Sequence, residues 1–447
     1  MSDPRYRAIR REDLESTPQW QSMDADLKRD LQVVSRVLPF RSNSYVMAEL
    51  IDWSQAPDDP MFQVYFLQRD MLAPEHFRTI SQLVDSDASP ERIRQAANRI
   101  RLSLNPNPAG QFTHNLARLG RRTLPGVQHK YRDTVLLFPP SAQTCHAFCS
   151  FCFRWPQFVG MKELQFSQRE NDDFLAYLRE HREVTDVVVT GGDPMIMHAS
   201  ILASYLEPLL APEFEHVQTI RIGTKSIANW PYRYTQDQDA DAVLRLFERV
   251  VAAGRHLAIM GHYNHPIELS TPAAREAISR IRATGAQIRM QSPLLRRVND
   301  SADAWASLWS TGARLGIIPY YMFVERDTGP RSYFEVPIVR AWEIFRDAFS
   351  RVSGVARTAR GPSMSAFPGK IQVDGVVDIR GECAFALSFI QARKPEWVRR
   401  PFYARFDRRA TWFDELKPAF GEASFFFESA SQSDAAEGHV LRLLATG

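Results

Sequence analysis

The segment TVLLFPPSAQTCHAFCSFC (Thr134–Cys152) joins a short apolar run to three cysteines. The run TVLLF has the β-branched and apolar residues that are typical of a buried strand. The cysteines follow with the spacing C-x3-C-x2-C, at Cys145, Cys149 and Cys152. Thiolates spaced so closely in one loop can hold an iron–sulfur cluster. The segment therefore predicts a strand with a metal-cluster loop at its carboxyl end.

Five further strand-like runs follow this loop, and ten or more residues with helical periodicity separate each from the next. This alternation is typical of right-handed β-α-β units in a parallel sheet. Six strands fall short of the eight of a closed barrel, so the sequence predicts an α/β fold with a partial (β/α)6 barrel. The predicted strands are Thr134–Phe138, Asp186–Thr190, Thr219–Gly223, Leu257–Gly261, Gln287–Gln291 and Ile317–Phe323. The predicted helices between them are Gln168–His181, Ser200–Leu210, Ala240–Ala253, Pro272–Thr284 and Ala302–Leu315.

The barrel is predicted to be one of three regions. Residues 1–125 are expected to form a helical N-terminal region that includes the proline-rich connection NPNPAG (Asn105–Gly110). Residues 126–350 would form the barrel core, and residues 351–447 a C-terminal extension. Catalytic groups of such barrels lie at the carboxyl ends of the strands, so we expect the functional motifs at that end.

Composition favours a soluble, cytoplasmic protein. The formal net charge is +3 over 447 residues, without a basic block, which gives no support for nucleic-acid binding. The N-terminal sequence MSDPRYRAIRREDLESTPQW is charged throughout and lacks the apolar core of a secretory signal. The longest uncharged stretch, Thr134–Phe153, contains two prolines and three cysteines, so it is a poor membrane span. Four cysteines are too few for a disulfide scaffold.

A structural zinc site is the alternative interpretation of the cysteine loop. Zinc would need a fourth ligand, for which His146 or Cys383 could serve. The protein would then be a non-enzymatic zinc or iron–sulfur module that binds a partner. The barrel pattern and the glycine-rich segment TGGDP (Thr190–Pro194), which follows the second predicted strand, favour an enzyme instead.

The cysteine loop resembles that of the radical S-adenosylmethionine superfamily, in which C-x3-C-x2-C follows the first barrel strand. The resemblance implies a [4Fe–4S] cluster whose open iron chelates S-adenosylmethionine. An electron donor such as a flavodoxin or ferredoxin would then trigger formation of a 5′-deoxyadenosyl radical.

Further segments resemble the lysine 2,3-aminomutase family and occur in its order. They are HKYRDTVLLF (His129–Phe138), CSFCFR (Cys149–Arg154), TGGDPMIM (Thr190–Met197), RIGTKSI (Arg221–Ile227), HYNHP (His262–Pro266), QSPLLRRVND (Gln291–Asp300), PYYMF (Pro319–Phe323) and FPGK (Phe367–Lys370).

The resemblance to that family implies roles for individual residues. Arg154 matches the arginine that holds the α-carboxylate of an amino-acid substrate, since a guanidinium group binds a carboxylate bidentately. Lys370 matches the lysine that binds pyridoxal phosphate covalently. Asp193 would accept hydrogen bonds from the amino group of S-adenosylmethionine, and His262 is either a cofactor contact or a hydrogen-bonded core histidine. The implied contacts are Gly191, Gly192, Asp193, His262 and Gln291 for S-adenosylmethionine, and Lys130 and Tyr131 for pyridoxal phosphate.

Three positions depart from the family pattern around pyridoxal phosphate. The sequence SAFPG (Ser365–Gly369) replaces a glycine run, Phe151 replaces a histidine, and Thr134 replaces an arginine. These departures leave open a radical S-adenosylmethionine enzyme without pyridoxal phosphate, which would act on another small molecule or on a protein lysine.

The positions that select the substrate differ as well. Lysine-specific members pair two aspartates with the side-chain ammonium, whereas this chain has Arg326 at the first position and Ser363 at the second. An arginine would repel an ammonium group and could hold a carboxylate. The sequence therefore predicts an isomerase that moves an amino group from the α to the β carbon of glutamate or another non-cationic amino acid. A shift of the alignment by one residue would restore an aspartate, Asp327.

The family's C-terminal zinc-binding cysteines are missing, and a homo-oligomer is compatible with the sequence.

Overall fold

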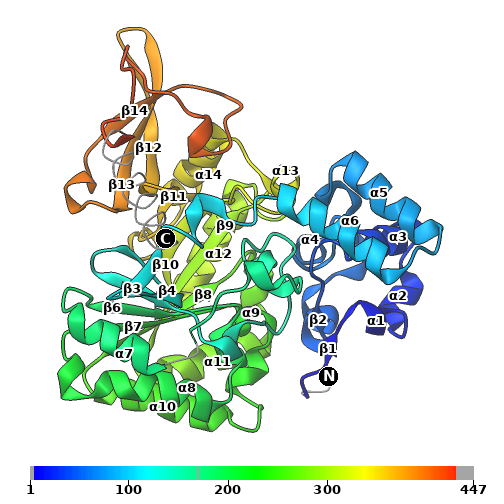
Figure 1. Ribbon diagram of the computed structural model, residues 1–447, viewed down its shortest axis with the longest axis horizontal. Helices are drawn as coiled ribbons and strands as arrows, with labels where there is room; N and C mark the ends of the chain where they lie inside the picture. Colours follow the sequence, from blue (N-terminus) through cyan, green and yellow to red (C-terminus); the bar gives the residue numbers. More distant parts are fainter. Residues whose placement is uncertain (1–4, 169–170, 429–447) are drawn as a thin grey trace.

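A single large sheet lies at the centre of the computed structural model, which describes residues 5–168 and 171–428 (Figure 1). In these residues twelve strands are hydrogen-bonded in the order β14-β13-β12-β11-β10-β9-β8-β7-β6-β5-β4-β3. The middle seven strands are parallel. They are β5 (Thr134–Leu137), β6 (Asp186–Val189), β7 (Thr219–Thr224), β8 (His256–His262), β9 (Gln287–Leu294), β10 (Ile318–Val324) and β11 (Arg360–Ser365).

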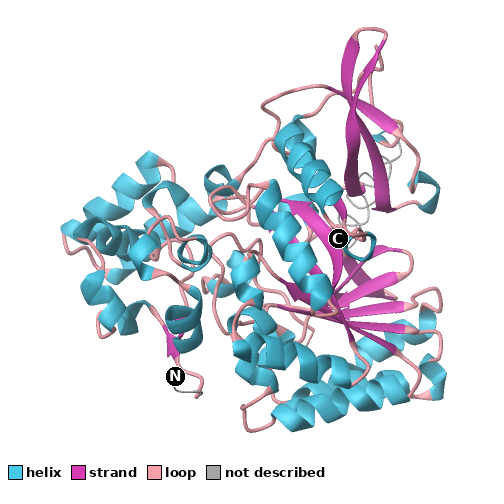
Figure 2. Cartoon of the chain, turned by 180° about the vertical axis from the view of Figure 1, so that it is seen from behind, coloured by secondary structure: helices cyan, strands magenta, loops and turns pink. Residues whose placement is uncertain are grey.

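Antiparallel strands extend both ends of this parallel core. Next to β5 lie β4 (Arg122–Tyr131) and β3 (Leu116–Leu119). Next to β11 lie β12 (Gly369–Ile379), β13 (Glu382–Ala392) and β14 (Phe402–Arg405). The long β12–β13 hairpin projects beyond the rest of the sheet (Figure 2).

The helices that connect the parallel strands are amphipathic and pack their apolar faces on the sheet. In α10, for example, Val243, Phe247 and Val250 are buried at helical spacing. Together with the strands these helices form the larger apolar core. They are α7 (Asn171–Glu180), α8 (Ala199–Leu206), α9 (Ser226–Asn229), α10 (Ala240–Ala252), α11 (Pro272–Ala283), α12 (Ala302–Arg314) and α14 (Ile338–Arg351). The short helix α13 (Arg331–Phe334) instead buries Tyr333 and Phe334 in the second core, which is described next.

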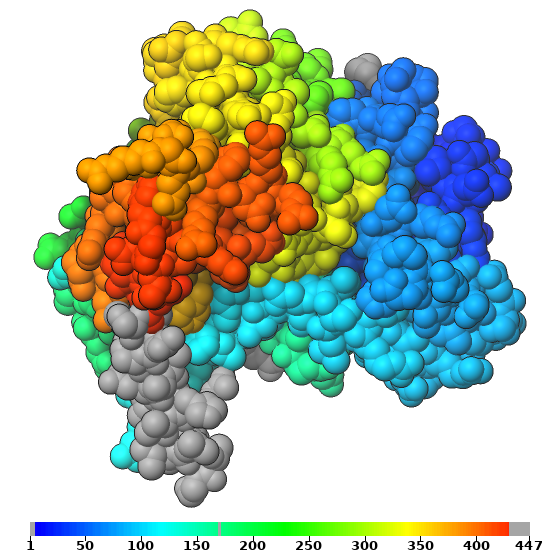
Figure 3. Space-filling model, turned by 90° about the horizontal axis from the view of Figure 1, so that it is seen from above, coloured from blue at the N-terminus to red at the C-terminus, as the bar shows by residue number. Residues whose placement is uncertain are grey.

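A separate group of helices precedes the sheet and lies at one side of the molecule, opposite the C-terminal strands (Figure 3). These helices enclose a second apolar core, and Ala147 and Phe151 of the cysteine loop are part of it. The elements are β1 (Ala8–Ile9), α1 (Arg11–Leu14), α2 (Pro18–Ser22), α3 (Ala25–Val34), β2 (Ser42–Asn43), α4 (Pro60–Tyr65), α5 (Pro74–Asp85) and α6 (Pro90–Ser103). None of the described helices has the length and apolar sequence that a membrane span requires.

The prediction of a mixed α/β fold is confirmed, and the six predicted strands are β5 to β10 in the predicted order. The five predicted helices correspond to α7, α8, α10, α11 and α12, although residues 169–170 of the first lie outside the described residues. The prediction missed β11, because its sequence RGPSMS lacks an apolar run and contains glycine and proline. The boundaries proposed at residues 125 and 350 stay a prediction, and residues 429–447 lie outside the described part of the chain.

Replacing Ile259 by alanine should destabilise the protein by about 2–5 kcal/mol, because this β8 side chain is fully buried in the larger core. The free energy of unfolding from urea titrations of the two proteins measures the difference. Ile201→Ala in α8 is the matched control, since Ile201 is 42% exposed and should change stability by no more than about 0.5 kcal/mol. Equal effects at the two positions would contradict the packing described for β8.

Candidate active site

The three cysteines of the loop after β5 line one cavity of about 290 Å³ at the carboxyl ends of the parallel strands. Burial raises the pKa of each thiol, so the thiolates need a cationic partner at this place. No three Cys, His, Asp or Glu side chains among the described residues converge closely enough to bind one metal ion. A [4Fe–4S] cluster does not need such convergence, because each thiolate binds a different iron. The donor set and its burial thus fit a cluster.

The fourth ligand that a zinc site would need is not supplied by either candidate. The His146 ring packs against Tyr6 and Trp230, at 5.4 and 6.5 Å between ring centroids. Cys383 is exposed in the β12–β13 hairpin. Neither residue lines the cysteine cavity, so the arrangement gives no support to the zinc interpretation.

The turn after β6 fastens the start of the cysteine loop. The backbone N–H of Gly192 donates to the carbonyl of Ala142 at 2.8 Å, and that of Asp193 donates to the carbonyl of Thr144 at 2.8 Å. A Cβ atom on Gly192 would lie 2.4 Å from the Thr144 oxygen. Glycine is therefore required for this close approach, which places Gly191, Gly192 and Asp193 in the wall of the cysteine cavity.

The N-terminal region holds the same loop from the other side. The backbone N–H of Phe148 donates to the carbonyl of Arg41, and that of Ser150 to the carbonyl of Val64, both at 2.8 Å. The Arg41 guanidinium group also donates to the carbonyl of Cys145 at 3.1 Å. The cysteine loop is thus hydrogen-bonded on both sides before any cofactor is considered.

Asp193 lines the cysteine cavity, but its carboxylate already has partners within the protein. It accepts hydrogen bonds from the Thr224 hydroxyl at 2.7 Å and from the backbone N–H groups of Met195 and Lys225 at 2.9 Å. The carboxylate of Asp193 therefore has hydrogen-bond donors without the ammonium group of S-adenosylmethionine that the sequence led us to expect. Asp193 ties the end of β6 to the end of β7.

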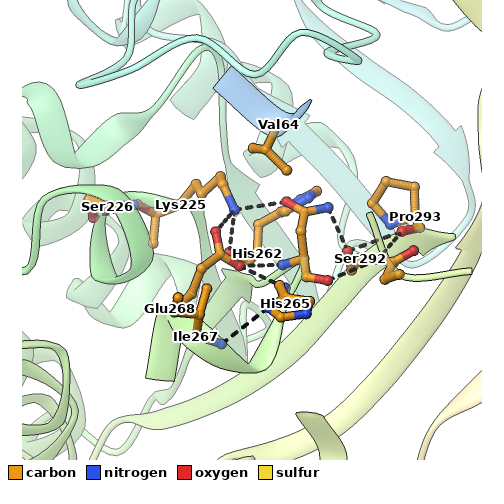
Figure 4. Close-up of polar contacts among 12 residues, drawn as sticks. Val64, Lys225, Ser226, His262, His265, Ile267, Glu268, Ser292 and Pro293 are labelled. Carbon is orange, nitrogen blue, oxygen red and sulfur yellow. Dashed lines mark hydrogen bonds and ion pairs between the residues drawn. The ribbon is translucent and has the colours of Figure 1, made fainter. Parts of the chain in front are cut away.

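A buried network that the sequence did not predict continues from β7 to β9 (Figure 4). The Lys225 ammonium group forms an ion pair with Glu268 and donates to Asn264 Oδ1 at 2.8 Å. The Asn264 side-chain amide in turn donates to the Ser292 hydroxyl at 2.9 Å. The sequence signal for this network was a lysine directly after a strand, in RIGTKSI. Its partner Glu268 lies 43 residues away, so the sequence did not indicate the ion pair.

His262 and Gln291, at the ends of β8 and β9, both line the cysteine cavity. The His262 ring stacks on Phe151, with 5.8 Å between the centroids. Burial lowers the pKa of His262, which favours the neutral ring, and its Nε2 atom has no hydrogen-bond partner within the described residues. His262 is therefore available to a ligand of the cavity.

A second cavity, of about 270 Å³, adjoins the first and contains Lys130, Tyr131 and Lys370. The two cavities share lining residues, among them Arg154 and Gln291. Two of the residues that depart from the family pattern also lie here, since Thr134 lines the second cavity and Ser365 lines both. The structure thus brings the two sets of predicted cofactor contacts into neighbouring spaces.

Lys370 is the second residue of β12 and lies beside Tyr321, with 4.1 Å between its Nζ and the ring centroid. Burial, together with the positive charges of Arg221 and Arg360, lowers the pKa of Lys370 to about 7. A substantial fraction of this amine is therefore uncharged at neutral pH and can act as a nucleophile. Lys130 is also buried, which lowers its pKa, and it donates to the carbonyl of Ala366. A nucleophilic amine beside a second amine fits an aldehyde cofactor with a phosphate group.

Arg154 lies in the wall shared by the two cavities. Its guanidinium group packs on the rings of Phe138 and Phe166, at 4.3 and 4.6 Å from their centroids. Its Nε and Nη2 atoms are buried and have no hydrogen-bond partner within the described residues. A buried guanidinium group with free N–H groups calls for an anionic ligand.

The three candidate specificity residues separate into two groups. Arg326 and Ser363 line the cysteine cavity, whereas Asp327 lines neither cavity. The Asp327 carboxylate instead accepts a hydrogen bond from the Asn105 side-chain amide at 3.0 Å. The geometry therefore favours the alignment that places Arg326, and not Asp327, at the first specificity position.

Replacing Gly192 by alanine should prevent the turn after β6 from docking on the cysteine loop, since the new Cβ would overlap the Thr144 carbonyl. We expect a loss of stability of about 1–3 kcal/mol and reduced iron and sulfide content after anaerobic reconstitution. Gly354→Ala is the control, because no atom lies within 4 Å of its Cβ position. Normal iron content in Gly192→Ala would contradict the proposed fastening of the loop.

Lys370 should titrate with a midpoint near pH 7 rather than at its usual value of 10.5. The native protein then binds fewer protons than the unfolded chain between about pH 7 and 10.5, so this group makes stability rise with pH in that window. The ¹³C chemical shift of lysine labelled at Cε measures the midpoint, and Lys370→Met assigns the signal. A midpoint near pH 10 would show that the amine is charged and solvated.

Comparison with known proteins finds no matching family model. The chain is 30% identical over 396 residues to a protein of Aquifex aeolicus named "Putative L-lysine 2,3-aminomutase", which covers 88% of this chain and 92% of that protein. It is 28% identical over 251 residues to the L-lysine 2,3-aminomutase of Escherichia coli, covering 56% of this chain and 69% of that one. With the L-lysine 2,3-aminomutase of Clostridium subterminale it shares 25% identity over 272 residues, covering 61% and 62%.

Solved structures give weaker matches. Streptococcus suis SuiB bound to the precursor peptide SuiA matches with a TM-score of 0.34 and 11% identity, covering 58% of this chain and 50% of that one. A radical SAM methyltransferase from Sphaerobacter thermophilus matches with a TM-score of 0.35 and 14% identity, covering 63% and 91%. These scores are too low to support any conclusion about function. The sequence relatives are decisive, and the chain belongs to the lysine 2,3-aminomutase family of radical S-adenosylmethionine enzymes.

Proposed function

We propose that the protein is a pyridoxal phosphate-dependent radical isomerase that moves an amino group from the α to the β carbon of an amino acid other than lysine. The observation that carries this proposal is the position of Lys370. Its amine, with a pKa lowered to about 7, lies in a cavity that adjoins the cavity of the three cysteines. A nucleophilic amine and a thiolate site in neighbouring spaces are what this chemistry needs.

The chain's own residues bind and orient the reactants in this proposal. Cys145, Cys149 and Cys152 would hold the cluster, and the Gly191–Asp193 turn with His262 and Gln291 would contact S-adenosylmethionine. Lys130, Tyr131 and Lys370 would hold pyridoxal phosphate, and Arg154 the α-carboxylate of the substrate. The bound cofactors supply a radical that removes a hydrogen and a ring that stabilises the migrating amine. The proposal includes an external electron donor, such as a flavodoxin or ferredoxin.

A curved sheet, as in a partial (β/α)6 barrel, belongs to the same proposal. Residues at the ends of β6 to β11 line the cysteine cavity. Neighbouring strands lie about 4.8 Å apart, so a flat sheet would spread these ends over roughly 24 Å. That residues from all six of these strand ends line one cavity supports a sheet that curves around it. The apolar walls from Phe151 and Phe323 would exclude water from the reaction.

The charge of the second cavity argues against lysine as the substrate. Its lining contains no acidic side chain, but it does contain basic ones. In the cysteine cavity the Asp193 carboxylate already accepts protein hydrogen bonds, and burial raises the pKa of Glu325 well above its usual value. A side-chain ammonium group would therefore find no free carboxylate to pair with. The basic lining residues of the second cavity are Lys130, Arg154, Arg221, Arg326 and Lys370.

Borohydride reduction of the anaerobically reconstituted protein with pyridoxal phosphate should leave a pyridoxyl group on Lys370, because its amine is nucleophilic at neutral pH. Peptide mapping by mass spectrometry identifies the modified residue. Lys370→Ala should lose the adduct, whereas the control Lys417→Ala, at an exposed position, should keep it. Release of 5′-deoxyadenosine under reducing conditions tests the radical step separately.

Two other outcomes would favour the alternatives. Release of 5′-deoxyadenosine without an adduct on Lys370 would indicate a radical enzyme that does not use pyridoxal phosphate. The observation that favours this alternative is that Thr134, which stands where the family has an arginine, is hydrogen-bonded to Asp186 at 3.3 Å. Failure to release 5′-deoxyadenosine, with the cluster intact, would indicate a binding module.

A further inference from the structure

We propose that the substrate is an amino acid with a second carboxylate, and that Arg326 binds this carboxylate in a subsite covered by the NPNPAG segment. The proposal rests on the proposed function, since Arg154 would bind the α-carboxylate of the same molecule. It narrows the substrate from any non-cationic amino acid to a dicarboxylic one.

Two arginines that carry buried, unpaired N–H groups support the inference. Arg154 and Arg326 both line both cavities. Nε and Nη2 of Arg154 and Nε of Arg326 are buried without a hydrogen-bond partner in the described part of the chain. The nearest acidic atom to Arg326, Asp327 Oδ1, lies 3.9 Å from its Nε, which is beyond hydrogen-bond distance. Burying such N–H groups unpaired is unfavourable, and two carboxylates of one ligand would satisfy both arginines.

The two arginines occupy different places, which is what a ligand with two separated carboxylates requires. Arg154 follows the cysteine loop, and its guanidinium group packs on Phe138 and Phe166. Arg326 follows β10, and its guanidinium group lies 5.2 Å from the Phe153 ring centroid and 6.0 Å from that of Trp412. The substrate would therefore extend from Arg154 toward Arg326 along the wall that the two cavities share.

The NPNPAG segment closes the subsite at Arg326. Arg326 Nη2 donates to the Pro108 carbonyl at 3.4 Å, and Pro108 lines the second cavity. The Asn105 side-chain amide donates to the Asp327 carbonyl at 2.6 Å, and the Thr328 hydroxyl donates to the Asn105 carbonyl at 2.6 Å. These bonds fix the backbone on both sides of Arg326. Asn105 is thus a positioning residue that acts through the segment carrying Arg326.

Serine at the second specificity position is compatible with a carboxylate. Ser363 is fully buried, lines the cysteine cavity, and has one weak hydrogen bond, to the Met322 carbonyl at 3.4 Å. An aspartate there would add a negative charge and repel a second carboxylate. A serine hydroxyl can instead donate to it.

Calorimetric titration of the reconstituted protein with single amino acids tests the proposal. L-Aspartate, L-glutamate and L-2-aminoadipate form the dicarboxylic series, and L-glutamine and L-lysine are the neutral and cationic probes. We expect at least one dicarboxylic amino acid to bind at least tenfold more tightly than both probes. A preference for L-lysine or L-glutamine, or no binding by any dicarboxylic amino acid, would overturn the proposal.

Variants of Arg326 locate the subsite. Arg326→Gln should weaken binding of the preferred dicarboxylic amino acid at least tenfold and leave L-glutamine binding within threefold, and Arg326→Lys should recover part of the loss. Arg314→Gln, at an exposed position, is the matched control and should bind like the unmodified protein. Equal binding by Arg326→Gln would overturn the proposal. So would a loss of pyridoxal phosphate content in this variant, because Arg326 would then serve the cofactor's phosphate.

The outcomes separate this inference from the proposed function. Binding of a dicarboxylic amino acid that depends on Arg326, without any adduct on Lys370, would leave the subsite standing and remove the aminomutase reaction. An adduct on Lys370 together with a preference for L-lysine would support the aminomutase reaction and overturn the carboxylate subsite at Arg326.

Discussion

The site depends on a set of backbone hydrogen bonds that hold the cysteine loop between two parts of the chain. Backbone N–H groups of the turn after β6 donate to the carbonyls of Ala142 and Thr144. On the other side, the N–H groups of Phe148 and Ser150 donate to the carbonyls of Arg41 and Val64 in the N-terminal region. Backbone groups must be paired when they are buried. The path of the cysteine loop is therefore set largely by main-chain contacts, to which the side chains of Arg41 and Ser150 add hydrogen bonds.

The two adjoining cavities differ in the charges of the side chains that line them. Three cysteines line the first cavity, and the carboxylate of Asp193, which also lines it, is paired with Thr224 and with backbone N–H groups. The Lys370 cavity is lined by basic side chains, and their mutual repulsion helps to keep one amine uncharged. The buried pair of Lys225 and Glu268 neutralises itself and links strand ends. The unpaired guanidinium N–H groups of Arg154 and Arg326 thus lie in the wall that the two cavities share.

Much of this arrangement could be predicted from the sequence, because local patterns produce it. Apolar runs predicted β5 to β10 in order. The structure places the cysteines, Arg154 and Lys370 in two adjoining cavities, and their roles stay a prediction. The parts that could not be predicted depend on tertiary contacts. The pairing of Lys225 with Glu268 joins the segments that follow β7 and β8, and the hydrogen bond by which Asp193 ties β6 to β7 needs the position of Thr224. The strand β11 is stabilised by its neighbours rather than by its own residues.

The contacts between the N-terminal region and the cysteine loop limit how this site can be re-engineered. The Ser150 N–H group donates to the carbonyl of Val64, 86 positions earlier, and its hydroxyl donates to the carbonyls of Gln63 and Val64. Phe151 packs in the N-terminal core. A three-cysteine segment grafted from this chain into another α/β scaffold would arrive with unpaired backbone groups and an exposed aromatic ring. A working graft would therefore have to carry the stretch from Arg41 to Val64 with it, as a second piece of the same module.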